Sequence, residues 1–127
     1  MRHPFANLIG LKVESQEAGR STCSLEVSEA LLNPHNVAHG AVIYALADTG
    51  MGVALYPSLR EGQICATIEI KINYYKAVYG GKILCETTIV NQGKSVANLE
   101  SSLFCDGQLI AKANGNYSIF TPSNKAG

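Results

Sequence analysis

Residues 33–50 have the sequence NPHNVAHGAVIYALADTG, and they decide how the rest of the chain can be arranged. Asn33-Pro34 predicts a loop, because this pair favours turn initiation. Beyond it, apolar residues recur at helical spacing with small residues between them, which predicts one long helix from about Ala38 to Tyr56. The apolar positions are Val42, Ala45, Leu46, Val53 and Leu55. Pro57 ends the helix, because proline disfavours helical geometry in the residue before it.

The segments on either side of this helix are rich in apolar and β-branched residues, as strands are. After the helix, apolar and polar residues also alternate, which is typical of strands. Turn signals at Ala18-Gly19, Gln92-Gly93 and Asp106-Gly107 separate neighbouring segments. Two strands are therefore predicted before the helix and four, in a meander, after it. The predicted strands are 9–16, 19–27, 65–75, 82–91, 95–105 and 108–120.

One amphipathic helix cannot cover a flat six-stranded sheet. The order of elements therefore predicts an α+β fold in which a curled antiparallel sheet wraps round the helix. The alternative is a flat sheet with an open face, which the low charge content would make sticky. Hydrophobic residues are 46% of the 127, enough for a real core. We expect one domain over 1–127 with its core at about 9–120.

The charge pattern narrows the range of partners. Ten basic and ten acidic side chains give a formal net charge of zero, and no basic block occurs, which argues against a nucleic-acid partner. Charged residues are only 16% of the chain, which hints that other subunits cover part of its surface. The N-terminal residues show no signal-peptide pattern, and the apolar stretch from Val42 to Leu55 is too short and too polar to span a membrane.

The cysteines predict a reducing environment. They lie in strand-like segments, with no CxxC pair and no cluster at zinc-ligand spacing. We expect small buried side chains with free thiols, as in cytoplasmic proteins, and no bound metal. The four positions are Cys23, Cys65, Cys85 and Cys105.

The start of the predicted helix is a candidate site for polarising a carbonyl oxygen. His39-Gly40 opens the helix, where backbone N–H groups are free and the helix dipole favours negative charge. Glycine allows a ligand to approach this backbone closely, as an oxyanion stabiliser requires. The alternative is an ordinary junction between a loop and a helix.

Asp48 is the only charged residue between Gly40 and Leu55. A carboxylate among alanine, leucine and glycine is costly to bury without a partner. A partly desolvated carboxylate is a candidate base or nucleophile. The alternative is a solvated position on the outer face of the helix.

The spacing between these two groups predicts an oligomer. Gly40 and Asp48 are eight residues apart, which is roughly 12 Å along a helix. A single substrate carbonyl cannot contact both within one subunit at reacting distances of about 3–3.5 Å. If both act on one carbonyl, two antiparallel helices must meet at a dimer interface, and the small residues of 45–52 suit such close approach.

The chain resembles the hotdog-fold thioesterase superfamily, specifically the PaaI-like (phenylacetate-pathway) and human THEM-type acyl-CoA thioesterases. The resemblance rests on NPHNVAHGAVIYALADTG, on TIEIKINYYKA and on the NQGKS turn, and it covers about residues 9 to 120. It implies a hotdog fold and an enzyme that hydrolyses an acyl- or aryl-CoA thioester to free acid and CoA. Coenzyme A would be part of the substrate, and no further cofactor is implied.

The resemblance also implies residue roles. Asp48 would be the base or nucleophile, and the backbone N–H of Gly40 would polarise the thioester carbonyl. Asn33 would help to place the thioester or water, Thr67 would lie near the attacking water, and His39 would shape the loop. Strand alternation groups Thr67 with Glu69 and Lys71, so a bulge or the dimer arrangement must bring it to the site. Many relatives have a second glycine where this chain has Ala41.

Contacts with the CoA phosphates are expected from Lys94 and Ser95, in the turn after Gln92-Gly93, and from Lys76. The alternative for this turn is an ordinary solvated hairpin. We expect acyl-CoA as the ligand and a cytoplasmic location, without nucleic-acid or membrane partners. We also expect at least a homodimer with shared active sites, and a tetramer as the full assembly.

Two other functions fit the same fold. One is a non-catalytic acyl-CoA-binding protein, which would not need a lone carboxylate beside an acyl pocket. The other is a hotdog dehydratase, with His39 as its general base. The segment NPHNVA does not resemble the dehydratase loop.

Overall fold

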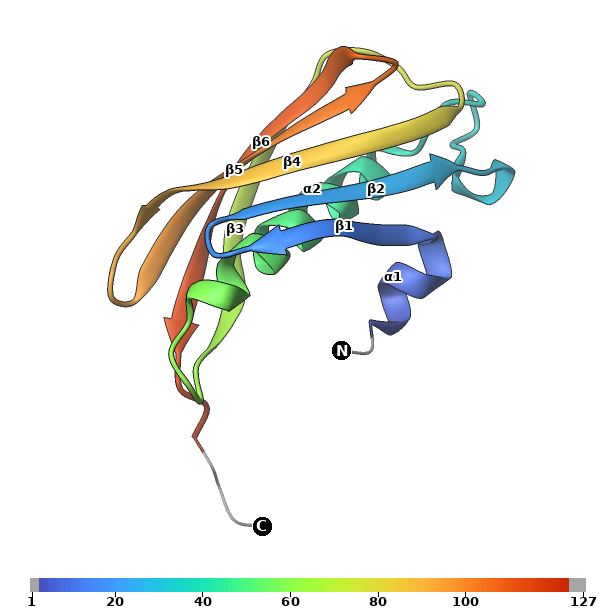
Figure 1. Ribbon diagram of the computed structural model, residues 1–127. Helices are drawn as coiled ribbons and strands as arrows, with labels where there is room; N and C mark the ends of the chain where they lie inside the picture. The colour runs from blue at the N-terminus through green and yellow to red at the C-terminus, as the bar shows by residue number, and fades with distance from the viewer. Residues whose placement is uncertain (1–2, 124–127) are drawn as a thin grey trace.

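A computed structural model describes residues 3–123, in which a six-stranded antiparallel sheet curls round one long helix, α2 (Figure 1). This confirms the predicted α+β fold. The ends of the expected domain, residues 1–2 and 124–127, lie outside the described residues. The helices and strands are α1 (Pro4–Ile9), β1 (Leu11–Glu17), β2 (Arg20–Val27), α2 (Gly40–Leu55), β3 (Ile64–Tyr74), β4 (Gly81–Gln92), β5 (Val96–Cys105) and β6 (Gln108–Phe120), with short 3-10 turns at Glu29–Leu31 and Tyr56–Ser58.

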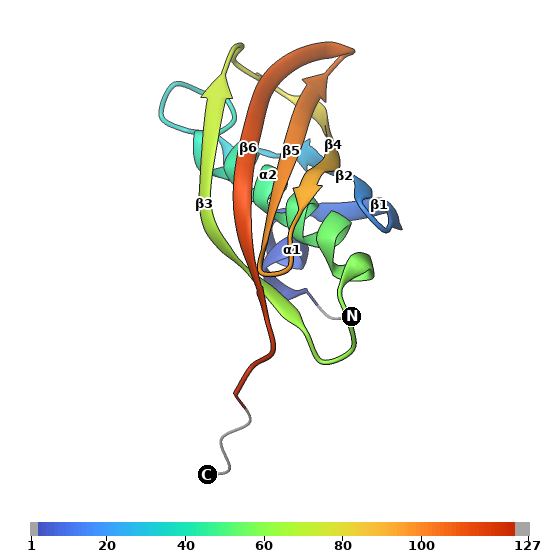
Figure 2. The ribbon, with the colours of Figure 1, turned by 90° about the vertical axis from the view of Figure 1, so that its left-hand side faces the viewer.

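The strand order is β1-β2-β4-β5-β6-β3, so the predicted meander of four strands is wrong in one respect. β4, β5 and β6 are consecutive neighbours, but β3 pairs with β6 at the edge of the sheet, and β4 pairs with β2 (Figure 2). The loop 75–80 crosses from one side of the β5–β6 pair to the other and is held there by hydrogen bonds from the amides of Tyr75 and Lys76 to Ile110 O. Sequence alternation predicts strands but does not specify this crossing.

α2 packs one face against the concave side of the sheet. Its buried residues recur at intervals of three and four, as expected for an amphipathic helix: Ile43, Leu46, Ala47, Gly50, Met51, Ala54 and Leu55. Three residues that the sequence assigned to the apolar face, Val42, Ala45 and Val53, are only partly buried. The opposite face, to which Gly52 belongs, is not covered by the sheet, and Asp48 lies at the edge of this face, in contact with β3 and β6.

Close approach of α2 to the sheet depends on Gly50. A Cβ atom at this position would lie 2.7 Å from Thr87 Oγ1 and 3.2 Å from Cys85 Sγ. The hydroxyls beneath the helix bond to its carbonyls, Ser21 Oγ to Gly50 O at 2.7 Å and Ser101 Oγ to Ala47 O at 3.2 Å. The turn of α2 that carries Asp48 is therefore fixed from below by buried hydrogen bonds.

The cysteines are free, as predicted. Burial raises the pKa of Cys23 to about 12 and that of Cys85 to about 11, so both remain thiols at neutral pH. Cys105 is also buried, whereas Cys65 is half-buried.

The sequence analysis missed the short helix α1. Pro4 occupies its first turn, His3 Nδ1 accepts a hydrogen bond from Ala6 N at 3.1 Å, and Gly10 ends it with a left-handed φ of 78°. Proline at the start and glycine at the end are the usual signals, but six residues are too few to show helical periodicity. Among residues 3–123, no helix is long and apolar enough to cross a membrane.

Candidate active site

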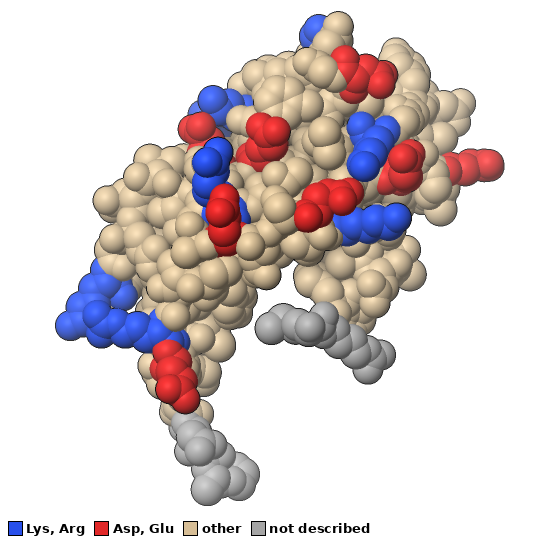
Figure 3. Space-filling view, viewed as in Figure 1, with Lys and Arg blue, Asp and Glu red and all other residues tan. Residues whose placement is uncertain are grey.

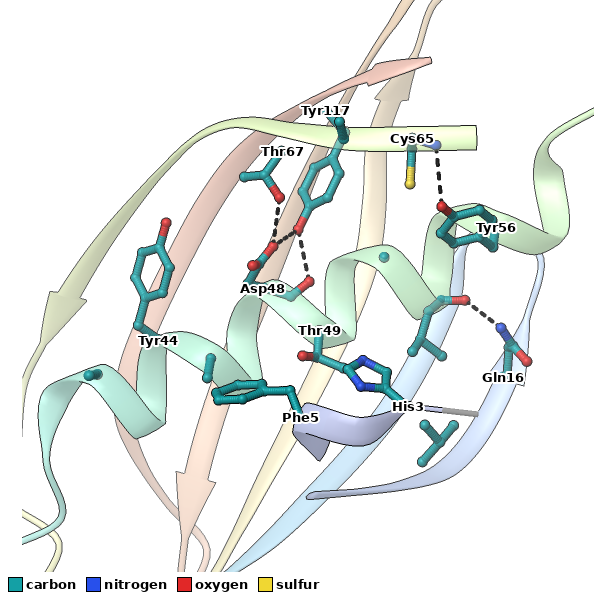
Figure 4. Close-up of a pocket in the computed structure, with 16 residues that line it drawn as sticks. His3, Phe5, Gln16, Tyr44, Asp48, Thr49, Tyr56, Cys65, Thr67 and Tyr117 are labelled. Atoms are coloured by element: carbon teal, nitrogen blue, oxygen red, sulfur yellow. Dashed lines mark hydrogen bonds between the residues drawn. The ribbon is translucent and has the colours of Figure 1, made fainter. Parts of the chain in front are cut away.

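The uncovered face of α2 borders a cavity of about 870 Å³, whose other walls come from α1, β1, β3 and β6. Ala41, Tyr44, Ala45 and Thr49 line it from the helix, and Phe5 of α1 closes one side (Figure 4). Apart from Asp48, the lining residues carry no carboxylate. The cavity therefore combines a largely apolar wall with one acidic group, as small-molecule sites do.

Asp48 is half-buried in this cavity and is held by two hydroxyl groups. Thr67 Oγ1 donates to Asp48 Oδ1 at 2.9 Å, and the Tyr117 hydroxyl donates to the same oxygen (Figure 4). The Tyr117 hydroxyl also lies 2.8 Å from Asp48 O. Both side-chain bonds reach the same oxygen, and Oδ2 has no hydrogen-bond partner among the described residues.

A bulge in β3 places Thr67 at Asp48. The pairing of β3 with β6 shifts between Thr67 and Glu69, which leaves Ile68 unpaired and 55% exposed. The extra residue reverses the alternation, so that Thr67 faces the helix together with Ile70. The sequence analysis required either a bulge or a dimer contact to bring Thr67 to the site. The structure has the bulge, within a single chain.

Gly115 makes room for the bulged strand. It is the β6 partner of Ile70, and a Cβ atom there would lie 2.8 Å from Met51 Sδ and 2.9 Å from Ile70 Cγ1. A side chain at this position would require Met51, Ile70 or the β3 backbone to shift. The absence of a side chain at Gly115 thus suits the close packing of β3, β6 and α2 beside Asp48.

The other end of α2 presents a free backbone donor. His39 is the N-cap residue, and its Nδ1 accepts from Ala41 N at 2.9 Å while its carbonyl accepts from Val42 N at 2.9 Å. No hydrogen bond among the described residues uses the N–H of Gly40. Tyr74 braces this residue, since its hydroxyl donates to Gly40 O at 2.7 Å. The predicted shaping role of His39 thus has a geometric basis, a cap that leaves the Gly40 N–H available.

Asn33 lies in the loop before the helix, and its side chain organises that loop. Asn33 Oδ1 accepts from His35 N at 2.8 Å and from Val37 N at 3.4 Å. Asn33 does not line the cavity that contains Asp48, and neither do Gly40 and His39. Gly40 instead borders a separate hollow of about 290 Å³ with Tyr74. Within one chain the structure brings together Asp48 and Thr67 and leaves the other predicted residues apart from them.

The three expected CoA-binding residues lie at different ends of the sheet. Lys76 borders the Gly40 hollow, and its Nζ donates to Gln108 Oε1 at 3.1 Å, beside the β5–β6 turn. Lys94 and Ser95 lie in the β4–β5 turn, at the opposite end of β5. One chain therefore does not gather them into one phosphate site.

Tyr117 is the residue of this site that the sequence analysis missed. It lies on the inward face of β6, which it shares with Ala113, Gly115 and Ile119 at every second position, and it is 3% exposed. It is the only residue of this inward set with a polar group, which was a usable signal. Alternation alone does not show which turn of the helix it faces.

Comparison with known proteins identifies the family. A model of the "Thioesterase superfamily" matches residues 35–112, which include the helix with Asp48 and the strand with Thr67. The chain belongs to this superfamily. It is a thioester hydrolase with a hotdog fold, and the match covers more than half of the sequence.

Relatives of this thioesterase come from several organisms. A protein of Archaeoglobus fulgidus, provisionally named an esterase, is 33% identical over 110 residues, 85% of this chain and 70% of that protein. The 1,4-dihydroxy-2-naphthoyl-CoA hydrolase of Listeria monocytogenes is 28% identical over 87 residues, 68% of this chain and 71% of that enzyme.

Solved structures agree with the fold of this thioesterase. A conserved protein from Pseudomonas aeruginosa has a TM-score of 0.88 at 27% identity and covers 94% of this chain and 96% of its own. A mutant of the phenylacetic acid degradation protein PaaI from Thermus thermophilus has a TM-score of 0.86 at 25% identity, with 91% and 98% covered.

Proposed function

We propose that this thioesterase hydrolyses an acyl- or aryl-CoA thioester to free acid and CoA, at a site shared by two copies of the chain. The observation that carries the proposal is the single carboxylate, Asp48, held by hydroxyls in a largely apolar cavity beside α2. The cavity of about 870 Å³ is large enough for an acyl or aryl group. A relative named as a naphthoyl-CoA hydrolase supports the same substrate class.

The reaction needs a base or nucleophile and an oxyanion donor. Asp48 either removes a proton from water, whose oxygen attacks the thioester carbon, or attacks that carbon itself to give an anhydride that water then hydrolyses. In both routes the C–S bond breaks and CoA leaves as a thiolate, which needs little acid catalysis. The scheme uses no metal and no redox cofactor.

The oxyanion donor in this proposal is the N–H of Gly40 from a second copy. In one chain Gly40 and Asp48 lie in separate hollows, roughly 12 Å apart along the helix. If two copies join their uncovered α2 faces in antiparallel fashion, the Gly40 end of one copy approaches Asp48 of the other. The first turn of α2 would then direct its free amide and its dipole at the developing negative charge.

The remaining predicted residues have secondary roles in this scheme. Thr67, which contacts Asp48, would help to place the attacking water, Asn33 would position the thioester or water, and His39 would shape the amide cap. Lys76 of one copy, with Lys94 and Ser95 of another, would meet the CoA phosphates only when several copies assemble. A tetramer in the cytoplasm is part of the proposal. Figure 3 shows charges of both signs interspersed over one face, without a continuous basic patch for nucleic acid.

The experiment is thioesterase turnover with short, medium and aromatic acyl-CoAs, detected with a thiol reagent, for the wild type and Asp48→Asn. Asn preserves the shape and removes the negative charge, so turnover should be abolished while the fold and CoA binding remain. The melting temperature should stay the same or rise, because a half-buried charge is removed. A wild type that hydrolyses no thioester in the panel, or an Asp48→Asn variant that keeps most of its turnover, contradicts the proposal.

The alternatives predict different outcomes. A non-catalytic binder would bind acyl-CoA without releasing CoA. A dehydratase would depend on His39, whose Nδ1 is occupied by the Ala41 amide. Loss of a hydroxyacyl-CoA's hydroxyl group without thiol release would favour the dehydratase.

A further inference from the structure

Tyr117 contacts both the main chain and the side chain of Asp48. Its hydroxyl donates to the carboxylate oxygen Oδ1 of Asp48 and lies 2.8 Å from Asp48 O. A tyrosine hydroxyl has one proton, which these two acceptors share. Because one acceptor is in the main chain and the other in the side chain, the contact restrains how the carboxylate rotates relative to the helix.

The second donor comes from the residue opposite Tyr117. Thr67 on β3 is the register partner of Tyr117 on β6, so the two hydroxyls stand side by side next to the β3 bulge. Both reach Asp48 Oδ1. The other oxygen, Oδ2, has no partner among residues 3–123 and belongs to a side chain that lines the cavity.

Tyr117 is suited to remain a donor throughout the pH range of the reaction. Its side chain is 3% exposed. Burial, and then its hydrogen bond with the Asp48 carboxylate, raise the pKa of Tyr117 far above its ordinary value. The phenol stays neutral and keeps its proton.

We propose that Tyr117 is a positioning residue that aims Asp48: with Thr67 it holds Oδ1, which leaves Oδ2 as the oxygen that attacks the thioester or takes the proton from water. This inference rests on the proposed function. It assigns a residue that acts through Asp48 and has no contact of its own with the reacting carbonyl. Removing the hydroxyl lets the carboxylate rotate out of line and slows the chemical step, whereas substrate binding is unaffected.

The test is Tyr117→Phe, which keeps the ring and removes the hydroxyl. We expect kcat to fall by about 10- to 100-fold, the scale of a misplaced reacting group, with KM within about twofold of the wild type. The matched control is Ser24→Ala, which also removes a buried hydroxyl, one that donates to Glu14 Oε2 at 2.5 Å and does not line the cavity or support α2. Ser24→Ala should lower the melting temperature and leave kcat unchanged.

The outcomes separate this inference from the function on which it rests. Wild-type kcat in Tyr117→Phe overturns the inference, and so does a loss no larger than that of Ser24→Ala. If Tyr117→Phe does not fold, Thr67→Val on the exposed edge strand removes the other Oδ1 donor, and unchanged kcat there overturns the inference equally. An inactive wild type or an active Asp48→Asn refutes the proposed function itself. An inactive Asp48→Asn beside a fully active Tyr117→Phe refutes only the role of Tyr117.

Discussion

The two functional ends of α2 are built in different ways. At its N-terminus the candidate group is the main-chain N–H of Gly40. This N–H is free because the His39 side chain caps the next amide, that of Ala41, instead. Two turns later the candidate group is the Asp48 side chain, held by hydroxyls from β3 and β6. The first depends on loop conformation and the second on the register of an edge strand. Each lies in its own hollow, so one chain holds two halves of a site.

The most direct test of the N-terminal half is Gly40→Pro, which removes the N–H and adds a ring whose Cβ would lie 3.3 Å from Tyr74. Proline is well accepted at the first position of a helix, and His39 has the extended conformation (φ −63°, ψ 135°) that a residue before proline prefers. We expect turnover to fall by about 100- to 1,000-fold, the cost of losing an oxyanion donor.

Gly40→Ala is the control for this variant, because it retains the N–H. Its Cβ atom would lie 3.3 Å from the Tyr74 ring, a contact that a small movement of that half-exposed side chain relieves. Equal losses in Gly40→Pro and Gly40→Ala would show that space, not the amide, matters at this position.

Asn33→Ala and Thr67→Ala test the secondary residues of the site, Asn33 in the loop before Gly40 and Thr67 beside Asp48. Each should lower turnover by about 10- to 1,000-fold, the range for lost positioning. Because Asn33 Oδ1 also accepts two amides of its own loop, Asn33→Asp is the informative companion. The carboxylate keeps these acceptor contacts and loses the amide donor. If steady-state kinetics show that Asn33→Asp is as active as the wild type, the donor has no part in the reaction.

Gly115→Ala tests whether the Asp48 half depends on the approach of β3. The added methyl group would lie within 3 Å of Met51 and Ile70, so overpacking should lower the free energy of unfolding by about 1–3 kcal/mol. Urea unfolding measures this effect, and turnover should fall with it as Thr67 moves from Asp48. Gly80→Ala, where a Cβ meets nothing within 4 Å, is the control. Equal stability of the two variants would mean that β3 adjusts without strain.

The same comparison explains what the sequence could and could not predict. The Gly40 half is contiguous in sequence, so a loop and a helix start were predictable from residues 33–40, whereas the His39 cap was found only in the structure. The Asp48 half is assembled from β3 and β6, which are distant in the chain. Asp48 could be identified from the sequence, but the role of Tyr117 could not. Alternation predicts which face of a strand a residue occupies, but not which residue of another element it contacts. The position of β3 at the sheet edge, and hence its pairing with β6, depends on the crossing loop 75–80, whose sequence does not specify which strands become neighbours.

Strand alternation also failed at one informative position. It grouped Thr67 with Glu69, and the β3 bulge at Ile68 reversed that grouping. A bulge has no fixed sequence signal, and the residue across from it, Gly115, lies where a Cβ atom would come within 3 Å of Ile70. The irregular position is the one that completes the environment of Asp48.

The measurement that tests the shared site most directly is complementation between inactive subunits. Asp48→Asn and Gly40→Pro chains with different affinity tags are co-expressed, and assemblies that contain both are purified through both tags. If Asp48 of one copy works with Gly40 of the other, each mixed dimer has one site with both defects and one site with neither. We predict about half of the wild-type turnover per dimer, from two parents that are each nearly inactive. Mixed assemblies no more active than their parents would contradict a site shared between two copies.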